Sequence, residues 1–186
     1  RDFINPLLSK KNNVSSEKFE EFKILFSQYK RDIDAQHAGK QSEPNIVTNV
    51  LKPFVDALGY ETNSHSQKGQ SGIDLSILKD NKPAVIFEVK KYKSSDMISY
   101  NNLNTKAFHE AVLYFMRERE KGNSALYHII ITDFYDWFVF DAKDFDRYFW
   151  NDNTIRKLFN IHINPSLLDN KTGDFYKSLS KAIGNI

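Results

Sequence analysis

Apolar residues recur at helical spacing through the first third of the chain. After Ser15 and Ser16, which can cap a helix, they follow at steps of three and four residues, and this pattern predicts an amphipathic helix that packs on the domain. A second helix is predicted from Pro44 to Gly59, with a bend at Pro53 because proline has no N–H to donate. The apolar positions of the first helix are Phe19, Phe22, Phe26, Tyr29 and Ile33.

Strand patterns dominate the middle of the chain. Short apolar runs on either side of a polar stretch around Asp80 predict a β-hairpin between Gly72 and Lys93. The apolar spacing then predicts one helix from about Thr105 to Lys121 and, after Ala142, several short helices. The further predicted strands cover residues 60–62, 125–132 and 135–141.

This order of elements predicts an α/β fold with a mixed central sheet flanked by helices. We expect residues 1–186 to form a single domain with its core at about 43–141. Residues 1–40 are then an N-terminal helical extension and residues 142–186 a C-terminal helical segment. Because residue 1 is Arg and not Met, we expect the chain to be a fragment of a longer protein.

Composition narrows the class of protein. A chain of 186 residues with 40% hydrophobic content can bury a sizeable core, and it contains no apolar stretch of the roughly 20 residues that cross a bilayer. The absence of cysteine excludes disulfides, thiolate metal sites and a cysteine nucleophile. With no secretion signal in the sequence, we expect an intracellular, cytoplasmic location.

The net charge of +2 is too small to indicate a nucleic-acid partner by itself, but the charge is unevenly distributed. Residues 68–106 contain seven Lys and four acids, whereas residues 132–152 contain six Asp against one Lys and one Arg. The basic end of the molecule should therefore lie around the hairpin.

Three charged residues fall on the hairpin strands. The two-residue period of a strand places Glu88 and Lys90 on one face, and Asp74 on the face opposite Ile73 and Leu75. Asp74 pairs directly with Glu88 if the paired residue numbers sum to 162, which requires an odd-numbered loop such as residues 79–83. The two Cβ atoms would then lie about 5 Å apart, and a two-residue loop would break this alignment.

Two carboxylates without His or Cys are hard oxygen ligands, which suit Mg²⁺ or Mn²⁺. Such an ion acidifies a bound water and neutralises charge on a phosphate, while Lys90 can orient the water or stabilise the transition state. Glu43, just before the second helix, is a candidate third carboxylate. We therefore predict metal-dependent hydrolysis of a phosphodiester by Asp74, Glu88, Lys90 and Glu43.

The competing interpretation is that these residues form an ordinary exposed face of the hairpin, with Glu88 and Lys90 as a surface ion pair. The D…ExK pattern occurs often by chance, since all three residue types are common. The five His show no ligand spacing, and no Gly-rich phosphate loop follows a strand.

At these residues the chain resembles the PD-(D/E)xK nuclease superfamily, in which Asp74 would be the motif aspartate and Glu88, Val89 and Lys90 the ExK. The resemblance implies a restriction-endonuclease-like core of order αβββαβ, and Glu43 sits where many members place a helix glutamate. Ile73 replaces the expected proline.

More narrowly, residues 102–120 and 131–149 resemble the N-terminal nuclease region of type IIG restriction enzymes. His109 stands where these relatives often carry Gln and Asp133 where they often carry Asn, whereas Glu110 matches. The resemblance thus gives His109 and Glu110 as auxiliary site residues, and Lys68, Lys91 and Lys93 are candidate contacts to the DNA backbone.

The resemblance implies a Mg²⁺-dependent endonuclease domain of a restriction-modification enzyme acting on double-stranded DNA. Methyltransferase and target-recognition domains, with S-adenosylmethionine as their cofactor, would lie elsewhere in the chain, and double-strand cleavage would imply dimerisation on DNA. Two alternatives remain: a repair or junction-resolving nuclease of the same fold, and a non-catalytic module that binds DNA or a partner.

Overall fold

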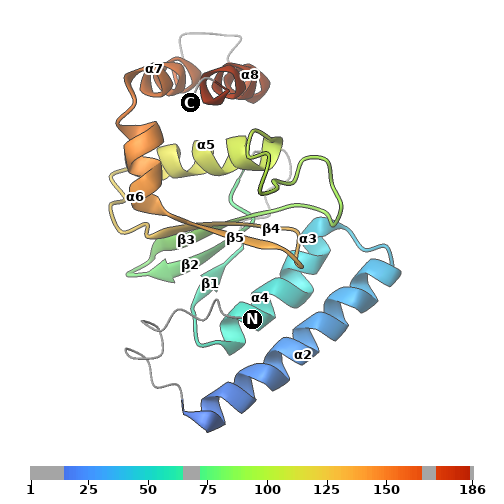
Figure 1. The fold of residues 1–186 in the computed structure, drawn as a ribbon. Helices are drawn as coiled ribbons and strands as arrows, with labels where there is room; N and C mark the ends of the chain where they lie inside the picture. The colour runs from blue at the N-terminus through green and yellow to red at the C-terminus, as the bar shows by residue number, and fades with distance from the viewer. Residues whose placement is uncertain (1–14, 65–71, 165–170, 185–186) are drawn as a thin grey trace.

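The computed structural model describes residues 15–64, 72–164 and 171–184. It has an α/β architecture in which a five-stranded mixed sheet lies between two sets of helices (Figure 1). The coarse fold class predicted from the hydrophobic pattern is therefore confirmed.

The sheet has the strand order β1-β2-β3-β4-β5, so every strand lies beside its neighbours in sequence. All neighbouring pairs are antiparallel except β3 and β4, which are parallel. A parallel pair needs a long crossover, which the loop after β3 and helix α5 (Lys106–Glu120) provide. The strands are β1 (Thr62–Asn63), β2 (Leu75–Lys79), β3 (Lys82–Val89), β4 (His128–Thr132) and β5 (Trp137–Asp141).

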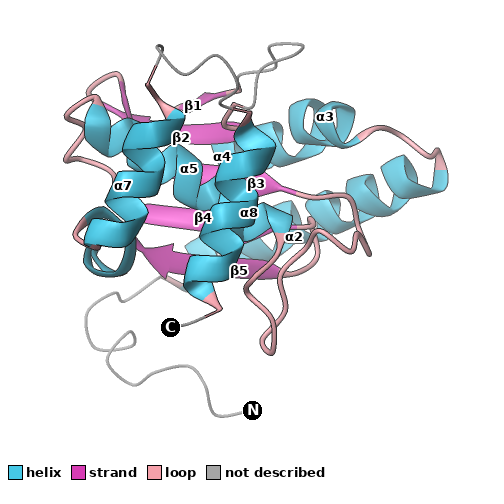
Figure 2. Cartoon of the chain, turned by 90° about the horizontal axis from the view of Figure 1, so that it is seen from above, coloured by secondary structure: helices cyan, strands magenta, loops and turns pink. Residues whose placement is uncertain are grey.

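Helices cover both faces of this sheet, and each face has its own apolar core. Helix α5 lies on one face with α7 and α8 stacked above it, while α2, α3 and α4 lie on the other (Figures 1 and 2). Ile86 and Ile131 belong to the core under α5, and Phe87 and Val89 to the core under α3 and α4. The helices other than α5 are α2 (Ser16–Ala38), α3 (Glu43–Ile46), η1 (Val47–Leu51), α4 (Lys52–Ala57), α6 (Ala142–Phe145), η2 (Asp146–Trp150), α7 (Asn153–His162) and α8 (Thr172–Ile183).

The β2–β3 hairpin closes in a way that the sequence reasoning did not anticipate. Its turn has only two residues, Asp80 and Asn81, both with positive φ, which matches the twist of a tight hairpin. A bulge then shifts the register, because Leu78 pairs with Pro83 and Ile77 with Val85, which leaves Ala84 as the extra residue. The predicted odd-numbered loop is thus wrong, but the bulge restores the sum of 162 beyond it.

The chain before Pro53 has a feature that the sequence did not predict. The helix widens into the π-helical turn η1 at residues 47–51, and Pro53 follows as the second residue of α4. The two segments are continuous, because the Lys52 N–H donates to the Val47 carbonyl. The helix starts at Glu43, and the strand predicted at residues 60–62 is instead β1 at Thr62–Asn63.

The N-terminal helix is confirmed as α2, with the Ser15 side chain accepting a hydrogen bond from the Lys18 N–H. Its packing differs from the prediction, because only Tyr29 and Ile33 are buried. The exposed apolar positions of α2 are Phe19, Phe22, Ile24 and Phe26.

Within the described part of the chain, no helix is long and apolar enough to cross a membrane.

Candidate active site

The predicted site residues meet at the end of β3. Glu88 is the second-last residue of β3, Lys90 follows the strand directly, and Asp74 precedes β2. Helix α5 contributes Glu110 from its second turn, and α3 contributes Glu43 as its first residue. Five residues from four places in the chain are therefore brought to one end of the sheet.

Strand register explains why Asp74 reaches this point. Leu75 pairs with Phe87 and Ser76 with Ile86, so the same register carries Asp74 to the position beside Glu88. Asp74 Oδ2 accepts a hydrogen bond of 2.7 Å from the Val89 N–H, which fixes the carboxylate against β3. Ile73, however, packs on the core under α5 and not with Leu75, so the predicted alternation stops at Asp74.

Glu88 and Lys90 form a buried pair. Glu88 is 2% exposed and Lys90 is 8% exposed. The Lys90 ammonium contacts Glu88 Oε1 and lies 2.7 Å from Glu110 Oε2, and it also donates to the Val89 carbonyl at 3.2 Å. This burial overturns the interpretation of an ordinary exposed hairpin face with a surface ion pair.

The second oxygen of Glu88 has no such contact. Glu88 Oε2 is buried and has no hydrogen-bond partner among the described residues. Buried polar atoms are nearly always satisfied, and an unpaired carboxylate oxygen is costly to keep away from water. This oxygen is therefore available to a ligand.

The environment raises the pKa of three carboxyl groups. Burial raises the pKa of Asp74 to about 7, although the Val89 N–H and Lys90 oppose the shift. Burial and the charge of Asp74 raise the pKa of Glu88 well above its usual range, and burial likewise raises the pKa of Glu43. Clustered carboxyl groups with raised pKa values are typical of functional sites.

The pKa of Lys90 shifts in the direction opposite to the effect of burial. Burial alone would lower its pKa, but the charges of Glu88 and Glu110 raise it above the ordinary value of lysine. Lys90 therefore remains an ammonium group at neutral pH. It can donate hydrogen bonds and carry positive charge, but it cannot accept a proton as a general base.

Glu43 joins the cluster from the opposite side of the sheet end. Its carboxylate accepts a hydrogen bond from the Lys91 N–H, and the charge of Lys90 favours its ionised form. Its place in the first turn of α3 also favours a negative charge. The structure thus places Glu43, the candidate third carboxylate, near Lys90 and Asp74.

The other predicted residues lie around or outside this cluster. His109 faces away toward α8, where its Nε2 lies 2.7 Å from Asn104 Oδ1 and its ring packs against Tyr176. Lys91 and Lys93 are exposed, with Lys93 over the ring of Tyr92. Lys68 lies outside the described residues.

Sequence reasoning missed Lys106. Its Nζ lies 3.9 Å from Glu110 Oε1 and 3.9 Å from Asp96 Oδ2. Lys106 therefore continues the series of ion pairs that begins with Lys90 and Glu110. The signal was present, because residues four apart on a helix are neighbours. Glu110 itself was predicted only from the family resemblance, and its 2.7 Å ion pair with Lys90 could not be read from the sequence.

The donor set fits a hard divalent cation in its chemistry, since Asp74, Glu88 and Glu43 offer only oxygen. As the side chains stand, no three His, Cys, Asp or Glu residues among those described are grouped so that they could hold a metal ion. Glu88 Oε1 is paired with the Lys90 ammonium instead. A complete set of metal ligands would therefore require Lys90 to leave Glu88.

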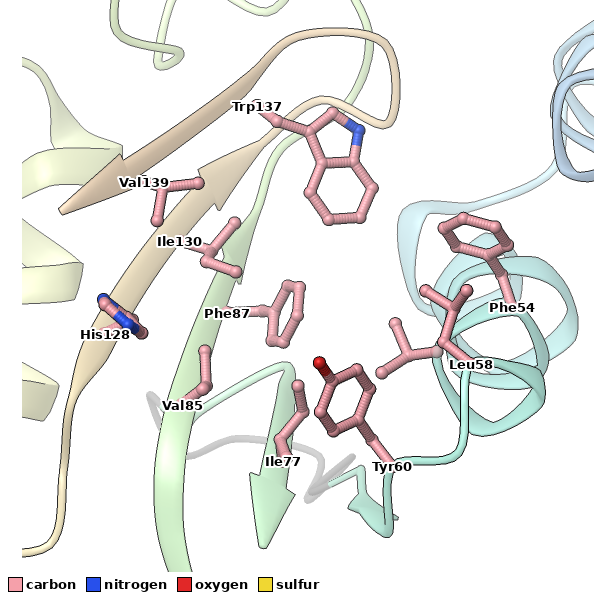
Figure 3. Close-up of a pocket in the computed structure, with 11 residues that line it drawn as sticks. Phe54, Leu58, Tyr60, Ile77, Val85, Phe87, His128, Ile130, Trp137 and Val139 are labelled. Carbon is pink, nitrogen blue, oxygen red and sulfur yellow. The ribbon is translucent and has the colours of Figure 1, made fainter. Parts of the chain in front are cut away.

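A separate apolar cavity of about 340 Å³ lies between α4 and the sheet (Figure 3). Figure 3 shows Phe54 of α4 and Leu58, which directly follows α4, facing Phe87 and Trp137 of the sheet. None of the predicted site residues lines this cavity. It carries no convergent set of charged groups comparable to the cluster at the end of β3.

Comparison with known proteins gives a family but no activity. The chain belongs to the family described as a domain of unknown function (DUF7149), whose family model matches residues 1–186. No curated protein and no solved structure matches the chain.

Proposed function

We propose that this member of the DUF7149 family is a metal-dependent DNA endonuclease domain of the PD-(D/E)xK type. The observation that carries the proposal is the buried Glu88, which keeps an oxygen without a partner beside Asp74 and Lys90. Lys90 pairs with Oε1 of Glu88, but a buried carboxylate oxygen without a partner, such as Oε2, is unfavourable. A cation bound between Asp74 and Glu88 would offset that cost.

Charge balance supports a divalent ion. Asp74 interacts electrostatically with Glu43, Glu88 and Glu110, and among the described residues Lys90 and Lys106 form ion pairs with these carboxylates. When all six groups are ionised, the carboxylates exceed the ammonium groups by two charges, and Asp96, which shares Lys106, adds a further negative charge. One Mg²⁺ would offset two of these charges, and Mn²⁺ should substitute because it accepts the same oxygen ligands.

Each residue then has a role that follows from its position. Asp74 and Glu88 would hold the ion, with Glu43 as the third carboxylate, and the bound ion would supply an acidified water and neutralise charge on the phosphate. Lys90, which stays protonated, would orient that water or stabilise charge developing on the phosphate. The exposed Lys91 and Lys93 would contact the DNA backbone.

The order of elements is compatible with a restriction-endonuclease-like core. Asp74 lies just before β2, Glu88 lies within β3 and Lys90 follows β3 directly. A helix that starts at Glu43 precedes strands β1, β2 and β3, and helix α5 with strand β4 follows. This is the αβββαβ order. It supports the nuclease proposal only together with the carboxylate cluster, because one fold can host many functions.

The proposal extends to a larger cytoplasmic restriction-modification enzyme. Methyltransferase and target-recognition domains of the same chain would use S-adenosylmethionine and select the DNA sequence. This module would contact mainly phosphates, and two copies would act together on the two strands of double-stranded DNA.

The direct test is cleavage of a supercoiled plasmid with Mg²⁺ or Mn²⁺. Wild type should nick or linearise it, and Asp74→Ala, Glu88→Ala and Lys90→Ala should each lower the rate by about a hundredfold or more. Circular dichroism should show that each variant is folded.

Exposed residues of the same types provide matched controls: Asp174→Ala, Glu61→Ala and Lys181→Ala should cleave as wild type does. The assignment fails if the three site variants cleave as fast as these controls. If the folded wild type binds Mn²⁺ and DNA but does not cut, the non-catalytic binding module is the correct interpretation.

A further inference from the structure

The Lys90 ammonium lies between two carboxylates from different elements. It contacts Glu88 Oε1 at the end of β3 and lies 2.7 Å from Glu110 Oε2 on α5. The side chains of Lys90, Glu88 and Glu110 are 11%, 3% and 12% exposed. In this water-poor setting the ammonium neutralises Glu88, which is the task that a metal ion would otherwise perform.

A metal ion and the ammonium would compete for Glu88. Both are cations, and like charges close together in a buried site repel each other strongly. Of the two Glu88 carboxylate oxygens, Oε2 has no partner among the described residues and Oε1 contacts Lys90. A metal ion can therefore coordinate Oε1, alone or together with Oε2, only after Lys90 has moved away from Glu88. The flexible stem of lysine and its three N–H donors allow such a movement.

Glu110 is placed to receive the ammonium. It already contacts Lys90 at 2.7 Å, and its other oxygen lies 3.9 Å from Lys106, which itself lies 3.9 Å from Asp96. Helix α5 is packed into the core on both sides of Glu110, through the fully buried Ala107 and Ala111. Glu110 is thus held in place independently of Glu88.

We propose that Lys90 acts as an internal cation that occupies Glu88 in the metal-free protein, and that Glu110 is the positioning residue that holds Lys90 when Glu88 binds the metal ion. This inference rests on the proposed metal site. Through Glu110, the affinity for the metal depends on a residue that does not touch the metal.

The test measures Mn²⁺ affinity of the full chain by electron paramagnetic resonance of the free ion, without any activity assay. Glu110→Gln should weaken Mn²⁺ binding by about tenfold or more, because Lys90 then has no carboxylate other than Glu88. In the Lys90→Met background, the same Glu110→Gln change should weaken binding by less than about threefold, because no ammonium remains to be held. Glu61→Gln, at an exposed position outside the cluster, is the matched control and should leave the affinity within about threefold of wild type.

The conservative variant separates positioning from simple charge. Glu110→Asp keeps the carboxylate and should restore part of the affinity lost in Glu110→Gln. If Lys90→Met does not fold, the comparison of Glu110→Gln, Glu110→Asp and Glu61→Gln still decides the question.

Two results would overturn the inference while leaving the metal site intact. In the first, Glu110→Gln binds Mn²⁺ as tightly as wild type. In the second, Glu110→Gln weakens binding by the same factor with Lys90 and with Met at position 90. By contrast, if wild type and Asp74→Ala show the same Mn²⁺ binding or none, the proposed metal site itself fails, and the inference fails with it.

Discussion

Burial sets the chemistry of the individual groups at the end of β3. Asp74 and Glu88 are held where water cannot solvate their charges, and the pKa of each is raised mainly for that reason. Lys90 in the same surroundings keeps its charge, because two carboxylates contact it. The same burial that costs stability therefore prepares oxygen ligands and a fixed ammonium group.

Asp74 should make the stability of the metal-free protein depend on pH. Its folded-state pKa of about 7 lies above its ordinary value of 3.8, so the folded state binds more protons between these values. Stability in EDTA should therefore fall as pH rises from about 4 to about 7, by at most about 1.4 kcal/mol per pH unit from this one group. Thermal melts at pH 5 and pH 8 measure this.

Asp74→Asn removes the titrating group but keeps an oxygen to accept the Val89 N–H. In EDTA at pH 8 the variant should therefore melt at a higher temperature than wild type, and Mn²⁺ should no longer raise its melting temperature. Asp174→Asn, at an exposed position of α8, should keep the wild-type profile. An Asp74→Asn variant whose melting temperature changes with pH just as wild type does would contradict this assignment.

At the scale of elements, the β2–β3 hairpin determines whether the site exists. Its two-residue turn alone would bring Asp74 opposite Phe87, and the bulge at Ala84 moves the register so that Asp74 meets Glu88. One residue of register would send the carboxylate to the other face of the sheet. The irregular residue in β3 is thus part of the geometry of the proposed site.

The turn itself can be tested at Asn81. Its φ of 60° is tolerated by Asn and Gly but is strained for a β-branched residue. Asn81→Val should lower the free energy of unfolding by about 1–2 kcal/mol, while Asn81→Gly should equal or exceed wild type. Urea unfolding gives both values.

The neighbouring Lys82 is the control for this turn, because it lies within β3, where a β-branched residue is favoured. Lys82→Val should change stability by less than about 0.5 kcal/mol. Equal losses in Asn81→Val and Lys82→Val would show that the backbone conformation of the turn is not the cause.

The sequence pattern predicted the hairpin strands and the second helix more accurately than it predicted the register of the strands and the irregular turn in the helix. Alternation along residues 84–90 identified β3 and the shared face of Glu88 and Lys90, since a half-buried strand imposes a period of two. The bulge at Ala84 was hidden, because a turn and a bulge that shift the register in opposite senses leave the hydrophobic pattern unchanged. The π-helical turn before Pro53 was hidden for a similar reason, because it keeps the apolar face continuous.

Packing between distant elements could not be read from periodicity. The helix pattern of α2 includes Phe19, Phe22 and Phe26, yet all three are exposed in the structure, since spacing shows an apolar face and not what covers it. The meeting of Lys90 with Glu110 likewise depends on how α5 crosses the sheet. His109, next in sequence to Glu110, points instead to Asn104.

On the scale of the whole molecule, the site lies at one end of a layered structure, with lysines beside it. Lys91 and Lys93 are exposed directly after Lys90, while α7 and α8 form the outermost layer beyond α5 (Figure 2). If DNA binds at the cluster as proposed, these two lysines are close to it along the chain and free to contact phosphates. This arrangement predicts an electrostatic contribution to DNA binding from one end of the sheet.

The combined variant Lys91→Ala, Lys93→Ala should weaken DNA binding and reduce its salt dependence. Each lost phosphate contact should lower the slope of log K against log salt concentration by about 0.9, so the pair should lower it by about 1.8. Fluorescence anisotropy of a labelled duplex at several salt concentrations measures the slope.

Lys177 and Lys181 on α8 are the matched controls, because both are exposed and lie in the outermost helical layer. The variant Lys177→Ala, Lys181→Ala should keep the wild-type slope. If both pairs lower the slope equally, DNA does not approach by the lysines that follow β3.

The parallel pairing of β3 with β4 has a consequence for the order in which the chain can assemble. Asp74 and Glu88 are brought together by a local hairpin, which forms quickly, whereas β4 can join β3 only after about forty residues have looped across, and such closures are slow. During folding the two carboxylates can thus meet before helix α5 brings Glu110 to them. At that stage the chain would have its acidic pair and its lysine together, but not yet the packed helix that completes their surroundings.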